Sequence, residues 1–389
     1  MLKERILLQQ INQYINSPEA IVITGMRRVG KTSLLKLIYE SINSDNKIFL
    51  DLENPINRKY FDEVDYDKIK STLEFLGLDF SHKAYIFLDE IQLIKNLPSV
   101  IKYLIDHYKI KFFLSGSASY YLKNLFSESL AGRKYIFELS TLNFEEFLLF
   151  KESSIKLPNS SKTITKPVFD KISTLYEEYI LFGGFPEVVL KKNFNEKNKS
   201  LEDIFSSYFN LEIIGLGGFR KNKVIRDLIL LLAQRVGTKL DIEKLSKELS
   251  ISRPTLYEYI SFLEGTYLIK TIKPFSKGRD IEIRKMPKIY FCDSGLLNYF
   301  ARIDKGMLFE NNVFQNLKLK GEVNYYQRKS GIEIDFILNM DTAIEVKMNP
   351  LDRDLSKLSA LAEEIGIKKI AIVSKNYSNL ENIWYGFLI

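Results

Sequence analysis

The stretch Gly25-Met-Arg-Arg-Val-Gly30-Lys31-Thr32 constrains the fold more than any other part of this 389-residue sequence. Its spacing is G-x-x-x-x-G-K-[S/T], in which the glycines let the backbone turn its N–H groups inward around a phosphate. An apolar run, residues 20–25, precedes the motif, and a helical pattern follows it. This context is the one that the motif requires, so the sequence predicts a triphosphate-binding loop between a strand and a helix.

The residues of this loop have distinct expected roles. Lys31 is expected to reach the β- and γ-phosphate oxygens, and Thr32 to offer its hydroxyl oxygen to Mg²⁺. The helix that begins near Lys31 adds the positive end of its dipole. Arg27 and Arg28 leave three alternatives open, which are phosphate, DNA and solvent. The residues expected to contact the nucleotide are Gly25, Arg28, Val29, Gly30, Lys31, Thr32 and Ser33.

Residues 1–150 alternate short apolar runs with helical patterns. The runs are dense in Ile, Phe, Val and Leu with little polar alternation, which is typical of strands buried on both faces of a parallel sheet. We therefore predict an α/β fold in which helices cover both faces of a doubly wound parallel sheet. The predicted strands are residues 20–25, 47–52, 84–90, 111–117 and 134–139.

The run YIFLDEIQ, residues 85–92, supplies the acids that a nucleotide hydrolase needs at the end of a second buried strand. Asp89 is expected to hold the water shell of Mg²⁺, and Glu90 to polarise the attacking water, because in-line attack on a phosphate needs an adjacent proton acceptor. The alternative for Asp89 is a strand-end carboxylate that only caps a helix. The sequence thus predicts both halves of an ATPase site.

The rest of the chain divides by pattern into further regions. A polar stretch, residues 153–167, contains nine Ser, Thr, Pro or Asn residues and no acid, and is interpreted as a linker or exposed loop. Helix, helix, turn, helix and two β-like runs then follow in the order of a winged helix-turn-helix. The expected domains are an ATPase domain (1–152), a helical lid-like region (168–222), a winged helix-turn-helix (223–290) and a C-terminal α/β domain (306–389).

Two runs near the C-terminus, GIEIDFIL and AIEVKM, carry charged residues at strand spacing. Glu345 and Lys347 are two apart and point the same way, so a hairpin would bring them together with Asp335. Asp335 and Glu345 are hard oxygen ligands suited to Mg²⁺, and Lys347 would orient a water or offset charge on a phosphate. Glu310 falls on the apolar stripe of its helix, where a buried carboxylate needs a partner. A solvated sheet face is the alternative.

The basic residues suggest a nucleic-acid surface. The formal net charge is +7 and the pI about 9.0. We expect contact with the DNA backbone rather than base reading, since the predicted second helix offers little beyond Arg253. The alternative is a module that only packs between its neighbours. Residues 270–288 contain only two acids, Asp280 and Glu282, but seven basic residues, which are Lys270, Lys273, Lys277, Arg279, Arg284, Lys285 and Lys288.

Taken together, the motifs resemble prokaryotic P-loop ATPases of the AAA+ type whose C-terminal part carries a winged helix and a restriction-endonuclease-like, or PD-(D/E)xK, domain. The resemblance rests on GMRRVGKTSLL, LDEIQ, LSGSAS, LAGRKYIFEL, FGGFPE, KIYFCDSGL, FENNVF, and GIEIDFIL with IEVK.

That resemblance implies ATP and Mg²⁺ as ligands, and Ser117, or Ser115, as a sensor of the γ-phosphate. It also implies that Arg133 is an arginine finger serving a neighbouring subunit, and therefore a homo-oligomer; a pair with a carboxylate on its own surface is the alternative for Arg133. It further implies a nuclease-like site whose tetrad is complete. Its members are Glu310, Asp335, Glu345 and Lys347.

Composition excludes several other classes of protein. The one cysteine, Cys292, allows no internal disulfide framework and no zinc cluster. No apolar run reaches the roughly 18 residues of a membrane span, so a cytoplasmic protein is expected. The predicted function is ATP hydrolysis coupled to DNA, with a Mg²⁺-dependent nuclease-like domain. The alternative is an ATP-driven signalling or scaffold switch whose C-terminal domain is not catalytic.

Overall fold

The chain folds as two compact units, one of residues 1–140 with 265–267 and the other of residues 141–264 with 268–389. The structure is a computed structural model that describes residues 2–117, 130, 132–219, 222–276, 286–328 and 330–389. None of the described helices is long and apolar enough to cross a lipid bilayer.

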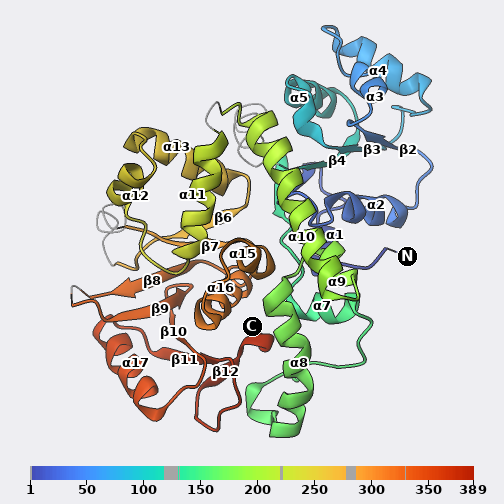
Figure 1. Ribbon diagram of the computed structural model, residues 1–389. Helices are drawn as coiled ribbons and strands as arrows, with labels where there is room; N and C mark the ends of the chain where they lie inside the picture. The colour runs from blue at the N-terminus through green and yellow to red at the C-terminus, as the bar shows by residue number, and fades with distance from the viewer. Residues whose placement is uncertain (1, 118–129, 131, 220–221, 277–285, 329) are drawn as a thin grey trace. The chain divides into compact units, whose positions relative to one another are not determined.

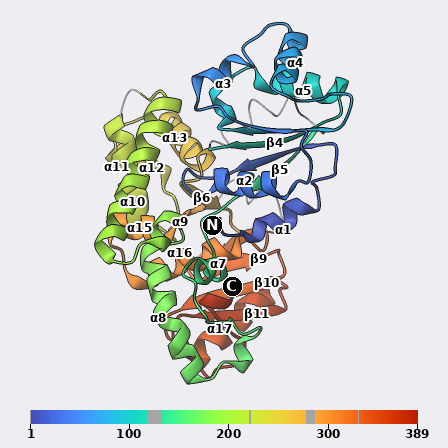
Figure 2. The ribbon, with the colours of Figure 1, turned by 90° about the vertical axis from the view of Figure 1, so that its right-hand side faces the viewer.

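The first unit is built on a five-stranded parallel sheet in the order β2-β3-β4-β1-β5. Figures 1 and 2 show α1 and α2 on one face and α3, α4 and α5 on the other. The strands are β1 Ala20–Thr24, β2 Lys47–Asp51, β3 Ala84–Asp89, β4 Ile110–Gly116 and β5 Lys134–Glu138. The helices are α1 Ile6–Asn12, α2 Lys31–Ser41, α3 Pro55–Lys59, α4 Tyr66–Phe75 and α5 Leu97–His107.

Alternate residues of the central strands fill two apolar layers, as a sheet covered on both faces requires. On one face Phe87 of β3 stacks on Phe113 of β4 with 4.5 Å between ring centroids, and Tyr39 of α2 meets Phe87 edge-on. On the other face Ile86 and Phe112 join a core with α4 and α5. The predicted α/β fold with a parallel sheet is confirmed.

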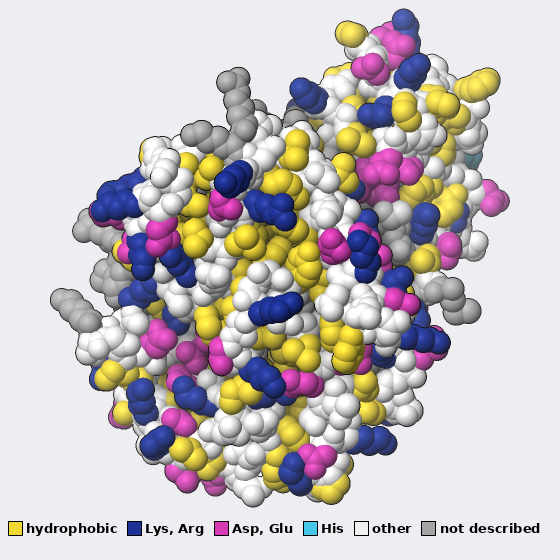
Figure 3. All heavy atoms as spheres, in the orientation of Figure 1, with side chains coloured by type: hydrophobic (Ala, Val, Ile, Leu, Met, Phe, Trp, Pro, Cys, Tyr) yellow, Lys and Arg dark blue, Asp and Glu magenta, His cyan; other side chains and the backbone are white. Residues whose placement is uncertain are grey.

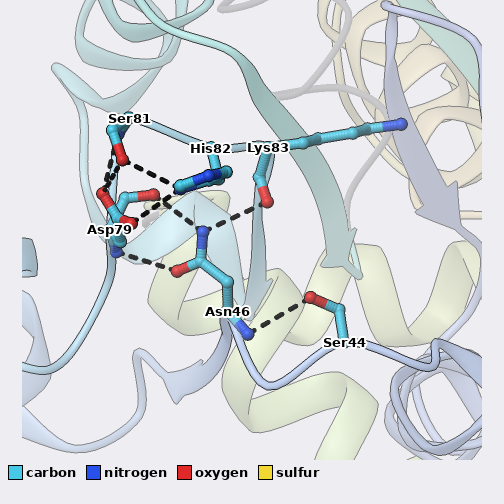
Figure 4. Close-up of polar contacts among 6 residues, drawn as sticks. All are labelled: Ser44, Asn46, Asp79, Ser81, His82 and Lys83. Carbon is cyan, nitrogen blue, oxygen red and sulfur yellow. Dashed lines mark hydrogen bonds and ion pairs between the residues drawn. The ribbon is translucent and has the colours of Figure 1, made fainter.

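A side-chain clamp fixes the loop that enters β3, as Figure 4 shows. The carboxamide of Asn46, just before β2, accepts from the backbone N–H of Asp79 at 2.8 Å and donates to the carbonyl oxygens of Asp79 and Lys83. Ser81 and His82 both bond the Asp79 carboxylate, and these bonds lower its pKa to about 2. His82 therefore belongs to a loop clamp at the edge of the sheet.

The second unit begins with helices and contains a short hairpin. The helices are α7 Phe144–Phe150, α8 Lys166–Phe182, α9 Pro186–Leu190, α10 Phe194–Tyr208 with a π-helix Phe209–Leu216, α11 Asn222–Gln234, α12 Ile242–Glu248, α13 Arg253–Gly265, α15 Ser294–Ala301, α16 Lys305–Leu317 and α17 Asp352–Glu364. Strands β6 Ile269–Ile272 and β7 Lys288–Phe291 pair antiparallel. Helix α13 begins at Arg253, and the Ser252 hydroxyl accepts from the Thr255 N–H as an N-cap.

A five-stranded mixed sheet closes the second unit, in the order β12-β11-β10-β9-β8. The chain just after β6 continues this sheet, because the Phe275 N–H donates to the Tyr325 carbonyl of β8 at 2.6 Å. The hairpin and the C-terminal sheet thus share one backbone ladder. The strands are β8 Val323–Gln327, β9 Glu333–Leu338, β10 Thr342–Lys347, β11 Lys369–Ser374 and β12 Ile383–Tyr385.

Buried asparagines on α16 explain the motif FENNVF. Asn311 both accepts from the N–H of Phe291 at 2.7 Å and donates to its carbonyl, so its side chain acts as a strand neighbour for β7. Asn312 accepts from the hydroxyl of Tyr176 on α8. Because a buried amide must be hydrogen-bonded, these side chains fix where α16 lies.

The motifs FGGFPE and CDSGL meet at Asp293, which is fully buried. One carboxylate oxygen accepts from the Gly184 N–H at 2.8 Å, and the other caps α15 by accepting from the Leu296 N–H at 3.0 Å. Gly183 has φ 74°, and a Cβ there would lie 1.9 Å from the Asp293 carboxylate. The two motifs form a structural joint between α8 and α15.

We predict that Asp293→Asn lowers the free energy of unfolding by about 1–3 kcal/mol at pH 7, because a carboxamide nitrogen would face an N–H donor. Burial raises the pKa of Asp293 from 3.8 to about 6. The folded state then binds the extra proton, so the advantage of Asp293 over Asn shrinks as pH rises from about 4 to about 6. Denaturant titrations followed by the fluorescence of Trp384, the one tryptophan, measure both. An advantage that grows over this range would contradict the assignment.

Candidate functional site

The first unit brings three strand ends to one edge of its sheet. Residues Ile23 and Ser115 are partners between β1 and β4, and Leu88 and Leu114 are partners between β3 and β4. The glycine-rich loop after β1, Asp89 at the end of β3, and Ser115 near the end of β4 therefore stand side by side. Ligands of parallel α/β sheets bind at this carboxyl edge.

The loop has a backbone that glycine allows. Gly30 has φ 100° where α2 begins. At Gly25 the φ is 146°, and a Cβ there would lie 2.2 Å from the Leu139 carbonyl oxygen. The buried Lys31 ammonium donates to the carbonyl oxygens of Gly25 at 3.1 Å and Met26 at 2.9 Å. These bonds hold the ammonium across the loop.

Arg5 is a brace for this loop that sequence reasoning missed. It is 6% exposed, and its guanidinium donates to the carbonyl oxygens of Val29 and Ser140, each at 2.8 Å. The brace fixes Val29, which is itself buried, between the N-terminal segment and the end of the unit. A lone arginine before α1 carries no signal in the sequence from which this contact could be read.

Asp89 is the meeting point of the site. It is 2% exposed, and its Oδ2 accepts from the Thr32 hydroxyl at 2.6 Å, while its Oδ1 accepts from the Ser115 hydroxyl. A carboxylate and a hydroxyl oxygen this close offer hard ligands that fit Mg²⁺. Thr32 and Asp89 would hold such an ion or its waters, and the ion would offset negative charge on a bound triphosphate.

Glu90 follows Asp89 in the left-handed region, with φ 56°. This conformation is uncommon outside glycine and gathers at functional sites. Burial raises the pKa of Glu90, and the charges of Lys31 and Arg27 oppose that rise. Its carboxylate accepts from the side-chain amide of Gln92, which also donates to the Ser117 hydroxyl at 3.1 Å. The two predicted sensor serines therefore have different partners. Ser117 is linked to Glu90 through the side chain of Gln92, whereas Ser115 donates directly to Asp89.

Of the remaining loop residues, Arg28 and Ser33 are exposed, and Arg27 lies 3.8 Å from the Glu53 carboxylate. Arg133 makes a two-pronged pair with Asp106 on α5, with Nε–Oδ1 2.7 Å and Nη2–Oδ2 3.2 Å. This pair with a carboxylate of its own unit is the alternative to the arginine-finger role that the sequence analysis gives for Arg133. A finger role would require Arg133 to leave Asp106.

In the second unit, Asp335, Glu345 and Lys347 come together as the strand spacing predicts. Asp335 is 8% exposed and accepts from the Val346 N–H at 2.8 Å across the β9–β10 hairpin. Glu345 is equally buried and accepts from the Lys347 ammonium at 2.7 Å. Burial and the charge of Asp335 raise the pKa of Glu345 to about 7, and Lys347 opposes them.

Glu310 reaches the same cluster from α16. It accepts from the Tyr290 hydroxyl at 2.7 Å, which supplies the partner that its burial requires. Burial and the charge of Asp335 raise the pKa of Glu310 to about 8, and the charge of Lys288 opposes that rise. The described residues contain no group of three or more His, Cys, Asp or Glu arranged to hold a metal ion, so Asp335 and Glu345 fit such a site only in part.

Lys288 is the residue of this cluster that the sequence misplaced. Its position in the sequence groups it with the basic residues of the hairpin, but its side chain is 3% exposed. Its ammonium lies 3.2 Å from the Glu333 carboxylate and 5.4 Å from the centroid of the Tyr325 ring. Its charge also lowers the pKa of Asp335 against the effect of burial. Lys288 is therefore an internal counter-ion of the acidic cluster.

The basic residues predicted to contact DNA are partly engaged elsewhere. Arg253 pairs with Glu243 at 3.0 Å and Lys270 with Glu264 at 3.3 Å. Lys273 is exposed, whereas Lys277 and Arg279 lie outside the described residues. On the face drawn in Figure 3, basic side chains lie among acidic ones rather than in one patch.

We predict that Lys288→Met lowers the free energy of unfolding by about 3–5 kcal/mol, because buried carboxylates lose their counter-ion. The exposed Lys270→Met is the matched control and should cost at most about 1 kcal/mol. Adding Glu310→Gln to Lys288→Met should recover part of the loss. Trp384 on β12 reports unfolding of this sheet. Equal losses in the two lysine variants would contradict the counter-ion role.

Comparisons with known families match an AAA domain over residues 17–148 and two domains of unknown function over residues 173–306 and 305–385. An uncharacterized protein of Haemophilus influenzae is 27% identical over 408 residues, which is 98% of this chain and 95% of that protein. The Walker-type ATPase PABY2304 of Pyrococcus abyssi superposes with TM-score 0.47 at 15% identity over 77% of this chain and 96% of that one, an overlap too low to support a conclusion.

The uncharacterized protein MJ1544 of Methanocaldococcus jannaschii is 30% identical over 331 residues, which is 82% of this chain and 71% of that protein. The AAA domain covers the loop, Asp89, Glu90 and Ser117. This chain is an AAA-type P-loop protein and belongs to the same family as MJ1544.

Proposed function

We propose that this protein binds ATP with Mg²⁺ at the carboxyl edge of its first sheet, hydrolyses it there, and uses the cycle to act on DNA. The observation that carries the ATPase proposal is the contact between the Thr32 hydroxyl and the Asp89 carboxylate, 2.6 Å apart, in a loop whose Lys31 ammonium is held by the Met26 carbonyl oxygen. A hydroxyl, a carboxylate and an ammonium are the groups that metal-assisted phosphoryl transfer uses.

Each side chain then has one task in the reaction. The loop N–H groups and Lys31 bind the phosphates, and Lys31 exchanges its two carbonyl partners for phosphate oxygens. Glu90 accepts a proton from the attacking water, and burial raises the pKa of its carboxyl group above the ordinary value. Ser117 contacts the γ-phosphate. Arg133 is proposed to act on a neighbouring subunit after leaving Asp106, in a homo-oligomer.

The test is steady-state ATP turnover together with equilibrium binding. We predict that Lys31→Ala abolishes both, because the loop loses the ammonium that is proposed to bind the phosphates. Glu90→Gln should keep binding and lower kcat roughly 10²- to 10⁴-fold, the usual contribution of a general base. Lys36→Ala, on the exposed side of α2, is the matched control. Wild-type turnover in Glu90→Gln would remove Glu90 from the mechanism.

For DNA, we propose that α11, α12, α13 and the β6–β7 hairpin form a winged helix that contacts the phosphate backbone. The helix and strand order, the net charge of +7 and the exposed Lys273 support this assignment. Because Arg253 and Lys270 are paired with acids, DNA would have to compete for them. Binding of this kind weakens steeply as salt is added.

For the C-terminal domain, we propose a restriction-endonuclease-like fold in which Asp335 and Glu345 hold Mg²⁺ and Lys347 orients the attacking water. The joint placement of these three side chains supports a nuclease. The alternative, an ATP-driven signalling or scaffold switch with a non-catalytic C-terminal domain, is favoured by the internal counter-ion Lys288.

A DNA-cleavage assay distinguishes the nuclease from the non-catalytic switch. Under the nuclease proposal, the protein cuts DNA in Mg²⁺, and Asp335→Ala abolishes cutting while ATP turnover stays within about twofold of wild type, because the two sites belong to different compact units. Duplex, branched and single-stranded DNA are compared, each with and without ATP. DNA left intact by the wild type in every combination favours the switch. Cutting that survives Asp335→Ala comes from another source.

A further inference from the structure

We propose that Gln92 is a positioning residue for ATP hydrolysis, and that its side-chain amide fixes the Glu90 carboxylate relative to Ser117 at the end of β4. The inference rests on the proposed ATPase function, because it assigns a role within that same site. Gln92 belongs to the sequence motif LDEIQ, in which only the two acids had an expected role.

The geometry around Gln92 follows from the backbone of Glu90. The positive φ of Glu90 ends β3, and a short 3-10 helix, Ile91–Leu93, turns the chain back at once. This turn brings the side chain of Gln92 into contact with the side chain of Glu90, two residues earlier in the chain. Its Nε2 donates to the Glu90 Oε2 and also to the Ser117 Oγ at 3.1 Å. A primary amide has two N–H groups, so one nitrogen serves both partners.

Burial makes these bonds decisive for where Glu90 points. Gln92 is 9% exposed and Ser117 is 1% exposed, so bulk solvent has little access to either side chain. A movement of Ser117 on contact with a γ-phosphate is therefore passed to Glu90 through one side chain. A neutral amide does this without adding charge, whereas a lysine at this position would hold the base by neutralising it.

The other end of the amide is incomplete. The Gln92 Oε1 is buried and has no hydrogen-bond partner within the described part of the chain. A buried acceptor without a donor costs about 1–3 kcal/mol. A water molecule between Glu90 and Gln92 would donate one O–H to each, which would satisfy Oε1 and aim the lone pair of the water away from both. Gln92 then orients the same water whose proton Glu90 accepts.

The experiment compares Gln92→Met, which keeps the length of the side chain, with Gln10→Met on an exposed position of α1 as the matched control. We expect Gln92→Met to lower kcat roughly 10- to 100-fold while the Kd for Mg·ATP, measured by calorimetry, changes less than about threefold. A merely structural role would instead move binding and thermal stability together. If Gln92→Met does not fold, Gln92→Ala, which only removes atoms, takes its place with the same expectation.

A double variant shows whether Gln92 acts through Glu90. Glu90→Gln with Gln92→Met should be no slower than Glu90→Gln alone, within about twofold, because the second change has nothing left to position. Independent, multiplying losses would overturn the inference, as would wild-type kcat in Gln92→Met. If Lys31→Ala and Glu90→Gln lose turnover while Gln92→Met keeps it, the inference fails and the proposed function stands. If neither of those two variants changes turnover, both fail.

Discussion

The chemistry of the first unit depends on one hydrogen bond, which the Thr32 hydroxyl donates to the Asp89 carboxylate at 2.6 Å. It joins the loop after β1 to the end of β3, two strands that are separated in the sheet by β4. Such a contact is possible only because all three strands run parallel and end at one edge. The sheet is rigid there, since apolar layers pack on both of its faces. Side chains at this edge are consequently held before any ligand arrives.

The two candidate sites balance their buried charges in different ways. In the first unit, Lys31 is held by carbonyl oxygens and Asp89 by hydroxyls, which are neutral partners that a charged ligand can replace. In the second unit, the carboxylates face lysines, so the cluster is closer to neutral without a ligand. This difference favours the first unit as the place where a charged ligand binds.

Much of the fold could be predicted from the sequence because apolar runs and glycine spacing are local signals. Each predicted strand of the first sheet agrees with the structure within about one residue, as such boundaries permit. Lys288 shows where this approach ends: its neighbours in sequence are basic, and only the tertiary structure reveals that it points inward. The joint of Gly183 with Asp293 links residues 110 positions apart, and the brace from Arg5 reaches Ser140. Contacts between residues so far apart in the sequence produce no periodic pattern from which they could be predicted.

Gln92 illustrates a different gap. Its motif was visible, but a glutamine has no characteristic spacing that marks it as a partner of a catalytic acid, and its role follows from the reversed backbone at Glu90. The same backbone would place any residue at position 92 beside Glu90, so the choice of an amide there is informative.

The account depends most directly on whether the carboxyl edge of the first sheet accepts a triphosphate. Calorimetric titration of Mg·ATP into the folded protein measures this. The account predicts saturable heat with one nucleotide per chain, and none when Lys31 is replaced by alanine. The absence of heat from well-folded wild-type protein, or heat that is unchanged in the Lys31 variant, would contradict it.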